Sequence, residues 1–211
     1  MILYVNGDSH SAGTDLKIVN QSFPSLVARH FNLPIVNQSL PGGSNNYIIR
    51  ITQDWIRTCN EKYFVLIGWT SWEREEWPYQ GDFFQVNANN NTKGDKVLEQ
   101  QYRQWVSNLD DNNLPKLGQQ WHESIWHFHQ KLNVRGIPHL FFNFFYDFFV
   151  DKQDQMDWGP NFFHPYDSEY SYWHYLQRLK FRANGTLHFG PDAHRAWADV
   201  LIQHIKTHKL L

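Results

Sequence analysis

Short apolar runs that end in a polar or glycine turn alternate along this chain with stretches of helical spacing. The apolar runs cover residues 2–5, 33–37, 63–68 and 139–145. Apolar residues recur at helical spacing over residues 23–31, 45–58, 119–132 and 191–207. Such alternation is typical of a parallel sheet that is covered by helices on both faces. The sequence therefore predicts an α/β fold with three layers, helices on either side of a mostly parallel sheet.

Two stretches interrupt this alternation. Residues 72–118 are polar and rich in turn residues around 87–94 and 110–113, and residues 146–182 are irregular and aromatic. A chain of 211 residues with 41% hydrophobic residues is long enough to form one domain with its own core. We expect a single domain over residues 1–211, with insertions or a lid at roughly 72–118 and 146–182.

Charge and composition exclude several classes of partner. The formal net charge is −2 and the basic residues are scattered, so we expect no binding to nucleic acid or to anionic membranes. No apolar stretch is long enough to span a bilayer and no signal peptide leads the chain, so we expect a soluble cytoplasmic protein. Cys59 is the single cysteine, which excludes an internal disulfide and a thiolate metal cluster. We expect neither a metal nor a cofactor.

The first apolar run is followed directly by Gly7-Asp8-Ser9. A side chain at the carboxyl end of a parallel strand faces a crevice, and the start of the next helix stabilises negative charge there. Ser9 is therefore a candidate nucleophile. The alternative is a purely structural one, in which Asp8 and Ser9 only cap the helix that follows.

This opening resembles the first sequence block of the SGNH (GDSL-like) hydrolases, and three further blocks can be compared. The second resembles the segment from Asn37 to Gly42, where the resemblance implies that the N–H of Gly42 donates to an oxyanion. The third falls on residues 68–71, where Thr70 replaces the usual oxyanion asparagine, and Asn45 or Asn46 is an alternative source of that amide. The resemblance implies a flavodoxin-like sheet and a serine esterase.

The last block of this family resembles residues 188–198 and implies that His188 is the base. The acid of the family pattern is missing, because Gly185 stands three residues before His188. A backbone carbonyl, Asn184, Asp147 or Asp151 could orient the ring, or Ser9 and His188 could act as a dyad. His194 is the weaker candidate for the base, since Pro191 begins a helix that would place His194 among core positions.

For three other patterns, an ordinary structural role explains the residues as well as a functional role does, or better. His122 and His127 are five residues apart and would point to different faces of a helix, so a metal site is disfavoured and half-exposed histidines are expected. The tryptophans at 69, 72 and 77 either line a platform for sugar or acyl groups or pack under the insertion. The charged run at 73–76 alternates in sign and is interpreted as solvated.

The favoured hypothesis is a serine-dependent ester hydrolase. Ser9 and His188 would act with an oxyanion hole from Gly42 and Thr70, on a small-molecule or carbohydrate ester. A different class remains open because of the missing acid and asparagine, namely a catalytically inactive module of the same fold that binds glycans. An acyltransferase that uses Ser9 but excludes water is a third hypothesis.

Overall fold

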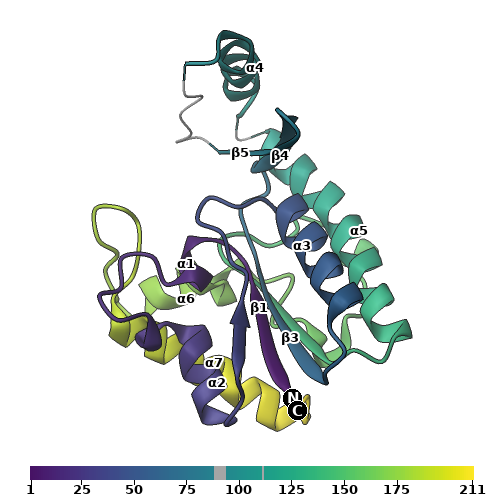
Figure 1. The fold of residues 1–211 in the computed structure, drawn as a ribbon, viewed down its shortest axis with the longest axis vertical. Helices are drawn as coiled ribbons and strands as arrows, with labels where there is room; N and C mark the ends of the chain where they lie inside the picture. Colours follow the sequence, from purple (N-terminus) through teal and green to yellow (C-terminus); the bar gives the residue numbers. More distant parts are fainter. Residues whose placement is uncertain (88–93, 111) are drawn as a thin grey trace.

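A four-stranded parallel sheet forms the centre of the molecule. The computed structural model describes residues 1–87, 94–110 and 112–211. Its strands are β1 (Ile2–Asn6), β2 (Ile35–Asn37), β3 (Tyr63–Trp69) and β6 (His139–Asn143), in the spatial order β2-β1-β3-β6. Tyr4 lies beside Val36 in β2 and beside Val65 in β3. Because all four strands are parallel, their carboxyl ends share one edge of the sheet (Figure 1).

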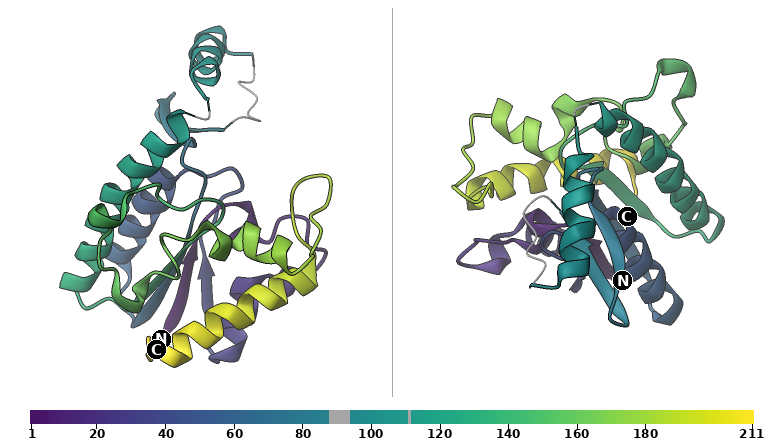
Figure 2. Two further views of the ribbon diagram at one scale, coloured as in Figure 1. Left: turned by 180° about the vertical axis from the view of Figure 1, so that it is seen from behind. Right: turned by 90° about the horizontal axis from the view of Figure 1, so that it is seen from above.

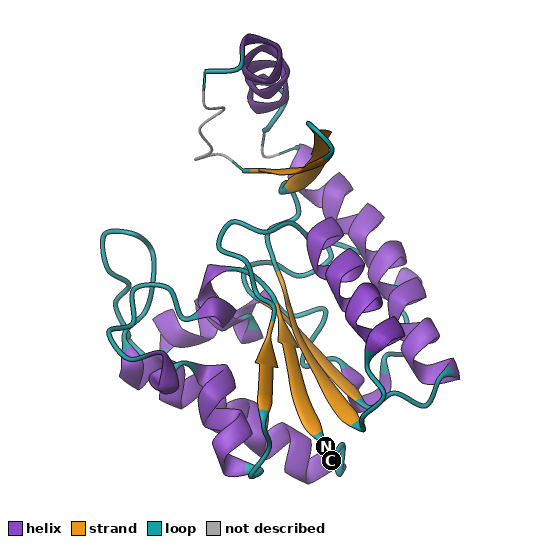
Figure 3. Ribbon diagram, viewed as in Figure 1, coloured by secondary structure: helices purple, strands orange, loops and turns teal. Residues whose placement is uncertain are grey.

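Helices cover both faces of the sheet (Figures 1 and 3). On one face lie α2 (Phe23–His30) and α7 (Pro191–His208), and on the other lie α3 (Asn45–Thr58) and α5 (Asn113–Val134). Leu3 and Val5 of β1 belong to the first of the two resulting cores, and Tyr4 belongs to the second. Because both faces are buried, the strands are apolar throughout. The single-domain α/β/α fold and its flavodoxin-like strand order confirm the predicted fold class.

A buried polar network fixes the turn that follows β1. The side-chain amide of Asn6 donates to the Tyr4 hydroxyl, to the Ile48 carbonyl and to Thr52 Oγ1, each over 3.2 Å. Its Oδ1 accepts the N–H of Gly7 over 2.8 Å. Both the NH₂ group and the oxygen of the Asn6 side chain are thus hydrogen-bonded inside the protein, as a buried amide requires. The turn into Ser9 therefore starts from a rigid position between β1 and α3.

Gly7 lies where α1 (Ser9–Ala12) approaches the sheet. A Cβ at residue 7 would lie 2.6 Å from Ser11 Oγ and 3.2 Å from the Gly68 carbonyl oxygen. The first distance is shorter than real Cβ contacts and the second is tight, so a larger residue would have to displace the Ser11 side chain and push against the backbone of β3. The close contact brings the start of α1 against the carboxyl end of β3.

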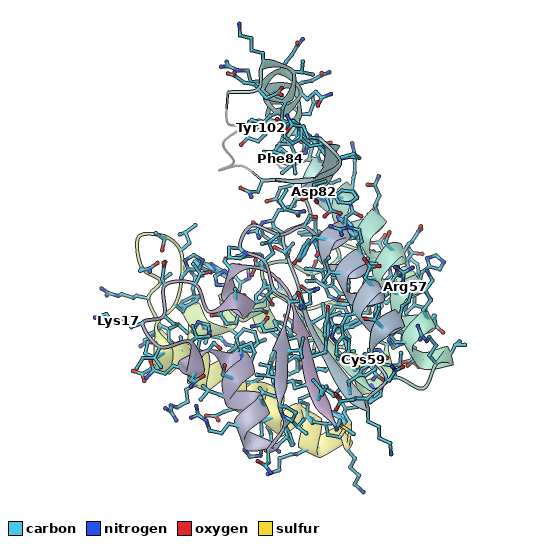
Figure 4. All side chains as sticks on the ribbon, in the orientation of Figure 1. Lys17, Arg57, Cys59, Asp82, Phe84 and Tyr102 are labelled. Carbon is cyan, nitrogen blue, oxygen red and sulfur yellow. The ribbon has the colours of Figure 1, made fainter. Side chains whose placement is uncertain are left out.

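The first interrupting segment contains secondary structure that the sequence did not predict. A hairpin of β4 (Glu75–Tyr79) and β5 (Asp82–Val86) is followed by α4 (Lys96–Ser107), and we call these three elements the arm. The arm projects beyond the carboxyl edge of the sheet (Figures 1 and 2), and Figure 4 shows Phe84 and Tyr102 within it. Trp77 packs edge-on against Trp105 at a centroid distance of 6.3 Å. Most of the turn-rich stretch at 87–94 lies outside the described residues.

Polar contacts attach the arm to the body. Arg50 of α3 forms two hydrogen bonds to Glu76, over 2.6 and 3.1 Å. Gln85 donates to the same carboxylate over 2.7 Å and accepts the N–H of Ser44 over 3.1 Å. These bonds hold the base of the hairpin over the start of α3. Charges at 75 and 76 are therefore paired or hydrogen-bonded, which shows that the interpretation of residues 73–76 as solvated was wrong for this part of the run.

The second interrupting segment packs as a covering layer rather than as a loose loop. It contains α6 (Tyr172–Arg178) and three short 3₁₀ turns, at Lys152–Asp154, Gly159–Asn161 and Ser168–Tyr170. One more 3₁₀ turn lies outside this segment, at Val19–Gln21. Phe148, Trp158 and Phe162 are buried in the core on the α5 side of the sheet. Trp69 and Trp72 are also buried. Both therefore pack inside the protein, and neither forms an open platform for sugar or acyl groups.

The histidines of α5 are not half-exposed as the sequence suggested. His122 and His129 are buried, and only His127 is exposed. His122 Nε2 lies 2.8 Å from the Tyr166 hydroxyl, and His129 Nδ1 lies 2.8 Å from Nε2 of His139 in β6. Burial lowers the pKa of His129 and of His139 to about 4. These rings are therefore neutral hydrogen-bonding groups of the core.

Both chain termini lie at the amino end of the sheet, away from the arm (Figure 2). Cys59 follows α3 on that side of the molecule (Figure 4). None of the helices within residues 1–87, 94–110 and 112–211 is long and apolar enough to cross a membrane.

His194 of α7 provides a test of this packing. It is buried, its Nδ1 accepts the N–H of Phe23 over 3.2 Å, and burial lowers its pKa to about 3. In the unfolded chain the His194 imidazole binds a proton below about pH 6.5. In the folded chain it binds one only below about pH 3. The free energy of unfolding should therefore fall by about 1.4 kcal/mol per pH unit for this residue as the pH drops through that window.

Replacement His194→Gln should remove this contribution, because the amide oxygen can accept the same N–H without titrating. Denaturant unfolding of both proteins between pH 6 and pH 5 measures the difference in slope. Trp197→Phe destabilises the same helix without removing a titrating group, so it should keep the wild-type slope. Equal slopes for His194→Gln and wild type would show that His194 is not held neutral.

Candidate active site

Ser9 is the first residue of α1, directly after β1. Asp8 caps this helix, since its Oδ1 accepts the N–H of His10 over 3.0 Å. The helix ends at Gly13, which has a φ of 74° in the left-handed region that glycine tolerates best. This single turn of helix is held between β1 and β3 by the close approach at Gly7. Ser9 is half-buried and lines a pocket of about 460 Å³.

Asp8 is fully buried and connects the Ser9 turn to the segment after β3. Its Oδ2 accepts the Thr70 hydroxyl over 2.9 Å and Nη1 of Arg74 over 3.0 Å. Burial by itself would raise the pKa of Asp8, but His10, Arg74 and the hydrogen bonds to the carboxylate together lower it. Asp8 is thus an ionised structural anchor, and the helix-capping role that was the alternative for Ser9 belongs to it.

Thr70 does not take the position expected of an oxyanion donor. Its single hydroxyl proton is used by Asp8, and the residue is buried. Its N–H donates to Asn45 Oδ1 over 3.0 Å, and its carbonyl accepts from Asn45 Nδ2 over 3.3 Å. Thr70 is therefore bonded to Asn45 through its backbone and to Asp8 through its hydroxyl. A hydroxyl has one proton to donate, so Thr70 cannot serve the oxyanion in this arrangement.

Gly42 lies in the turn after β2 and lines the same pocket as Ser9. The turn is closed by the N–H of Gly43 donating to the Leu40 carbonyl over 2.8 Å, and it is tied to the Ser9 turn by the Leu40 N–H, which donates to the Gly7 carbonyl over 3.1 Å. Gly42 has a φ of 75°, and a Cβ there would lie 2.8 Å from Nδ2 of Asn87. The left-handed φ favours glycine, and a Cβ would also displace the end of the Asn87 side chain.

His188 finds its carboxylate partner in a residue that the sequence analysis did not name. Nδ1 of His188 lies 2.8 Å from Oδ2 of Asp15, on the loop that follows α1. Asp15 has a φ of 66°, a left-handed conformation that aspartate tolerates better than most residues. Asp147 and Asp151, the carboxylates considered from the sequence, accept hydrogen bonds from Phe149 and Gln153 instead.

Two further side chains shape the contact between Asp15 and His188. Asn184 Oδ1 accepts the backbone N–H of His188 over 2.8 Å, while its amide donates to Asp15 Oδ2 over 3.2 Å. The Thr186 hydroxyl also donates to Asp15 Oδ2. These bonds from Thr186, His188 and Asn184 lower the pKa of Asp15 to about 2. Asn184 therefore supports the ring through the backbone and the carboxylate, and Asp15 remains ionised across the neutral range.

The pocket brings residues from five loops of the carboxyl edge together. Ser9, Gly42 and His188 all line it, and Thr70 does not. The other lining residues are His10, Thr14, Pro41, Arg74, Asn87, Phe145, Tyr146, Trp173, His174, Thr186 and Leu187. Within the described part of the chain, no hydrogen bond joins Ser9 to His188. Asn87 follows β5 of the arm directly, and its side-chain amide donates to the Gly42 carbonyl over 3.4 Å.

His10 is buried beside His188 and lines the same pocket as Ser9. Its ring centroid lies 5.2 Å from that of His188 and 5.0 Å from that of Tyr172. Burial lowers its pKa to about 4, so the ring is neutral near pH 7. A neutral His10 adds no charge that would repel a proton on His188.

His194, the other histidine considered for the base, lies inside the core as expected. It stacks on Phe23 at a centroid distance of 5.8 Å, with 12° between the ring planes. It is not among the residues that line the Ser9 pocket. Asp192, its neighbour in sequence, is in the first turn of α7, where negative charge is favourable.

Arg74 is a second site residue that sequence reasoning misplaced. The charged run at 73–76 was interpreted as solvated, but the Arg74 side chain is only 17% exposed and pairs with Asp8. Its guanidinium lies 5.8 Å from the ring centroid of Phe145. The alternating charges gave no signal for this, because a buried partner at residue 8 is remote in the sequence.

No group of three or more histidine, cysteine, aspartate or glutamate residues that could hold a metal is present within residues 1–87, 94–110 and 112–211. The pocket residues described above are hydroxyl, imidazole, amide and guanidinium groups with aromatic walls. That set suits acyl transfer to a serine hydroxyl.

No family model matches the chain, and no curated protein matches it in sequence. Among solved structures, one similar chain is the psychrotrophic esterase EstA from a Pseudoalteromonas species, inhibited by monoethylphosphonate. It has 14% identity and a TM-score of 0.48, with 98% of this chain and 97% of that chain covered. A member of the lipolytic protein G-D-S-L family from Veillonella parvula has 10% identity and a TM-score of 0.42, with 98% and 97% covered.

A third similar chain is TesA, at 13% identity and a TM-score of 0.45, with 100% of both chains covered. All three TM-scores are below 0.5. The chemistry of this site therefore has to be argued from its own residues.

Gly42→Ala tests the geometry of the pocket independently of any activity. We expect a loss of about 1–2 kcal/mol in the free energy of unfolding from the left-handed φ alone, because a Cβ is disfavoured there. The contact with Asn87 should add to this loss. Gly185→Ala is the matched control, since a Cβ at residue 185 meets nothing within 4 Å. Denaturant unfolding compares the two, and equal stability would contradict the turn described here.

Proposed function

We propose that this protein is a serine-dependent ester hydrolase in which Ser9 is the nucleophile, His188 is the general base and Asp15 orients His188. The observation that supports this most is the 2.8 Å contact between Asp15 Oδ2 and His188 Nδ1 at the pocket that Ser9 also lines. A carboxylate on Nδ1 places the proton on that nitrogen and leaves Nε2 free to accept one. Such a base can activate a serine hydroxyl.

The proposed reaction has two halves. Ser9 Oγ forms a bond to the ester carbonyl carbon while its proton passes to His188 Nε2, and the carbonyl oxygen takes up the negative charge. Collapse of this intermediate breaks the bond to the alcohol, which leaves with the proton from His188. Water then repeats the sequence on the acyl-serine, so that the acid is released and Ser9 recovers its proton.

The contact with Asp15 bears on the competing hypotheses. A non-catalytic glycan-binding module was considered because the family's acid was absent three residues before His188. Asp15 offers a carboxylate in its place, from the other end of the chain. An inert binding site would have no need of an ionised aspartate that two further side chains hold against the ring of a pocket histidine.

The pocket favours a compact acyl or carbohydrate ester. Its volume is about 460 Å³, and Phe145, Tyr146 and Trp173 form an aromatic wall. Aromatic faces bind both short acyl chains and the apolar faces of sugars. Phe162 and Phe163 are buried in the core and do not line the pocket.

Ser9→Ala should abolish hydrolysis of an activated acetyl ester and prevent labelling by a fluorophosphonate probe. The fold should be unaffected, because a half-exposed hydroxyl contributes little packing. His188→Ala should lower kcat by about 10³-fold or more, as loss of a triad member does in other serine hydrolases. Ester turnover and mass spectrometry of the labelled protein measure both effects.

His194→Gln is the control for this pair, because it removes a histidine that lies outside the pocket and should keep wild-type kcat at pH 7. Full activity in Ser9→Ala would refute Ser9 as the nucleophile. A wild-type protein that labels at Ser9 but transfers the acyl group only to an alcohol, and not to water, would point to an acyltransferase.

Asp15→Asn should lower kcat by about 10²-fold or more with little change in KM, because the neutral amide can hold the ring in the wrong tautomer. Asp15→Glu should recover part of the loss, which a merely structural role would not explain. Asp192→Asn removes a carboxylate beside a different histidine and should leave kcat unchanged. Steady-state kinetics decide the matter, and equal kcat values for Asp15→Asn and wild type would refute the role of Asp15.

A further inference from the structure

We propose that Arg74 is the side-chain oxyanion donor of this site, with its guanidinium held toward the bound ester by the Asp8 carboxylate. This inference rests on the proposed serine hydrolase function. It identifies the group that replaces the missing asparagine of the third sequence block.

The site lacks a side-chain donor at the expected place. Ser9 and Gly42 can each offer a backbone N–H, because neither donates to an acceptor among the described residues. Thr70 donates its proton to Asp8, and Asn45 is engaged by the Thr70 backbone. An oxyanion hole gains most from donors that are already fixed in position before the reaction. Arg74 is the cationic donor among the residues that line the Ser9 pocket.

Arg74 is held in position from three directions. Its backbone N–H closes a turn onto the Ser71 carbonyl over 3.3 Å. Its Nη1 donates to Asp8 over 3.0 Å, and the ring of Phe145 lies beside the guanidinium carbon. Two residues further along, the bidentate bond between Glu76 and Arg50 fixes the start of β4. The guanidinium is therefore restrained before any substrate binds.

Arg74 keeps part of its side chain exposed and lines the Ser9 pocket, as well as a neighbouring hollow that it shares with Trp72 and Glu75. Asp8 has no exposed side-chain surface, whereas Arg74 keeps 17% of its surface. Arg74 lines the pocket together with Ser9 and Gly42, and Asp8 does not. A guanidinium has five N–H donors, and the hydrogen bond found among the described residues uses Nη1. Other N–H groups remain for a ligand in the pocket.

The charges of the site fit this role. Asp8 and Arg74 are neutral as a pair, so the resting site does not carry an excess positive charge. When the carbonyl oxygen becomes negative, the guanidinium meets it from the pocket side while Asp8 stays buried behind it. A charge-assisted hydrogen bond is about twice as strong as a neutral one. The hydrogen bond from Arg74 therefore becomes stronger as negative charge develops on the carbonyl oxygen. Stabilisation that is larger in the transition state than in the bound ester is the condition for raising kcat.

Arg74→Gln should lower kcat on an acetyl ester by about 10²-fold, the usual effect of losing one oxyanion donor, while KM changes little. The rate of Ser9 labelling by a fluorophosphonate should fall in parallel, because the phosphoryl oxygen occupies the same place. Arg57→Gln is the matched control, since Arg57 is an exposed arginine that pairs with Asp54 and does not line the pocket. It should keep the wild-type kcat.

Loss of Arg74 also leaves a buried carboxylate without its cation, which destabilises the fold. The double variant Asp8→Asn with Arg74→Gln removes both charges, and asparagine can still cap α1. We expect this protein to melt close to the wild-type temperature and to remain about 10²-fold slow. Recovery of the wild-type kcat in the double variant would overturn the proposal, because Arg74 would then serve only to neutralise Asp8.

The outcomes for Arg74 and for the proposed function can be told apart. A wild-type protein that neither hydrolyses esters nor labels at Ser9 refutes the serine hydrolase. A wild-type protein that does both, with Arg74→Gln within about threefold of its kcat, refutes only the oxyanion role of Arg74. Since one oxyanion donor contributes about 10²-fold or more, the two results do not overlap.

Discussion

The geometry of the candidate site depends on one buried carboxylate. Asp8 caps α1 through one oxygen and binds Thr70 and Arg74 through the other, so it joins the turn after β1 to the segment after β3. A buried carboxylate is costly unless its oxygens accept hydrogen bonds, and here three donors bind them, the His10 N–H, the Thr70 hydroxyl and the Arg74 guanidinium. These contacts hold the turn that carries Ser9, the residue next to Asp8.

The parallel sheet explains why residues so distant in sequence meet at one pocket. Loops that follow β1, β2, β3 and β6 all lie at the same edge, and they deliver Ser9, Gly42, Arg74 and Phe145. The last contributor does not follow a strand of the sheet. His188 sits just before α7 and reaches the pocket because Asn184 and Asp15 hold its loop against the loop after α1. The site is thus built partly by topology and partly by side-chain contacts.

The sequence predicted the parts that local patterns encode. Apolar runs and helical spacing located β1, β3, α3 and α7 closely, since burial of both sheet faces leaves an unmistakable pattern. The carboxylate partner of His188 could not be predicted, because Asp15 is 173 positions away in the sequence and its left-handed backbone leaves no sequence pattern. The resemblance to the third sequence block assigned Thr70 to the oxyanion hole, but the Thr70 hydroxyl donates its proton to Asp8. The arm was missed because β4 and β5 are half-exposed strands without a strong apolar pattern.

The pairing of Asp15 with His188 joins two loops that lie far apart along the chain. The two residues are 173 positions apart, and Asn184 and Thr186 bind the same carboxylate. These side-chain contacts therefore close a long stretch of chain onto the loop after α1. Under the proposed function, a proteolytic cut between the two loops would leave the serine on one fragment and its base on the other, so activity would last only as long as the fragments stay associated.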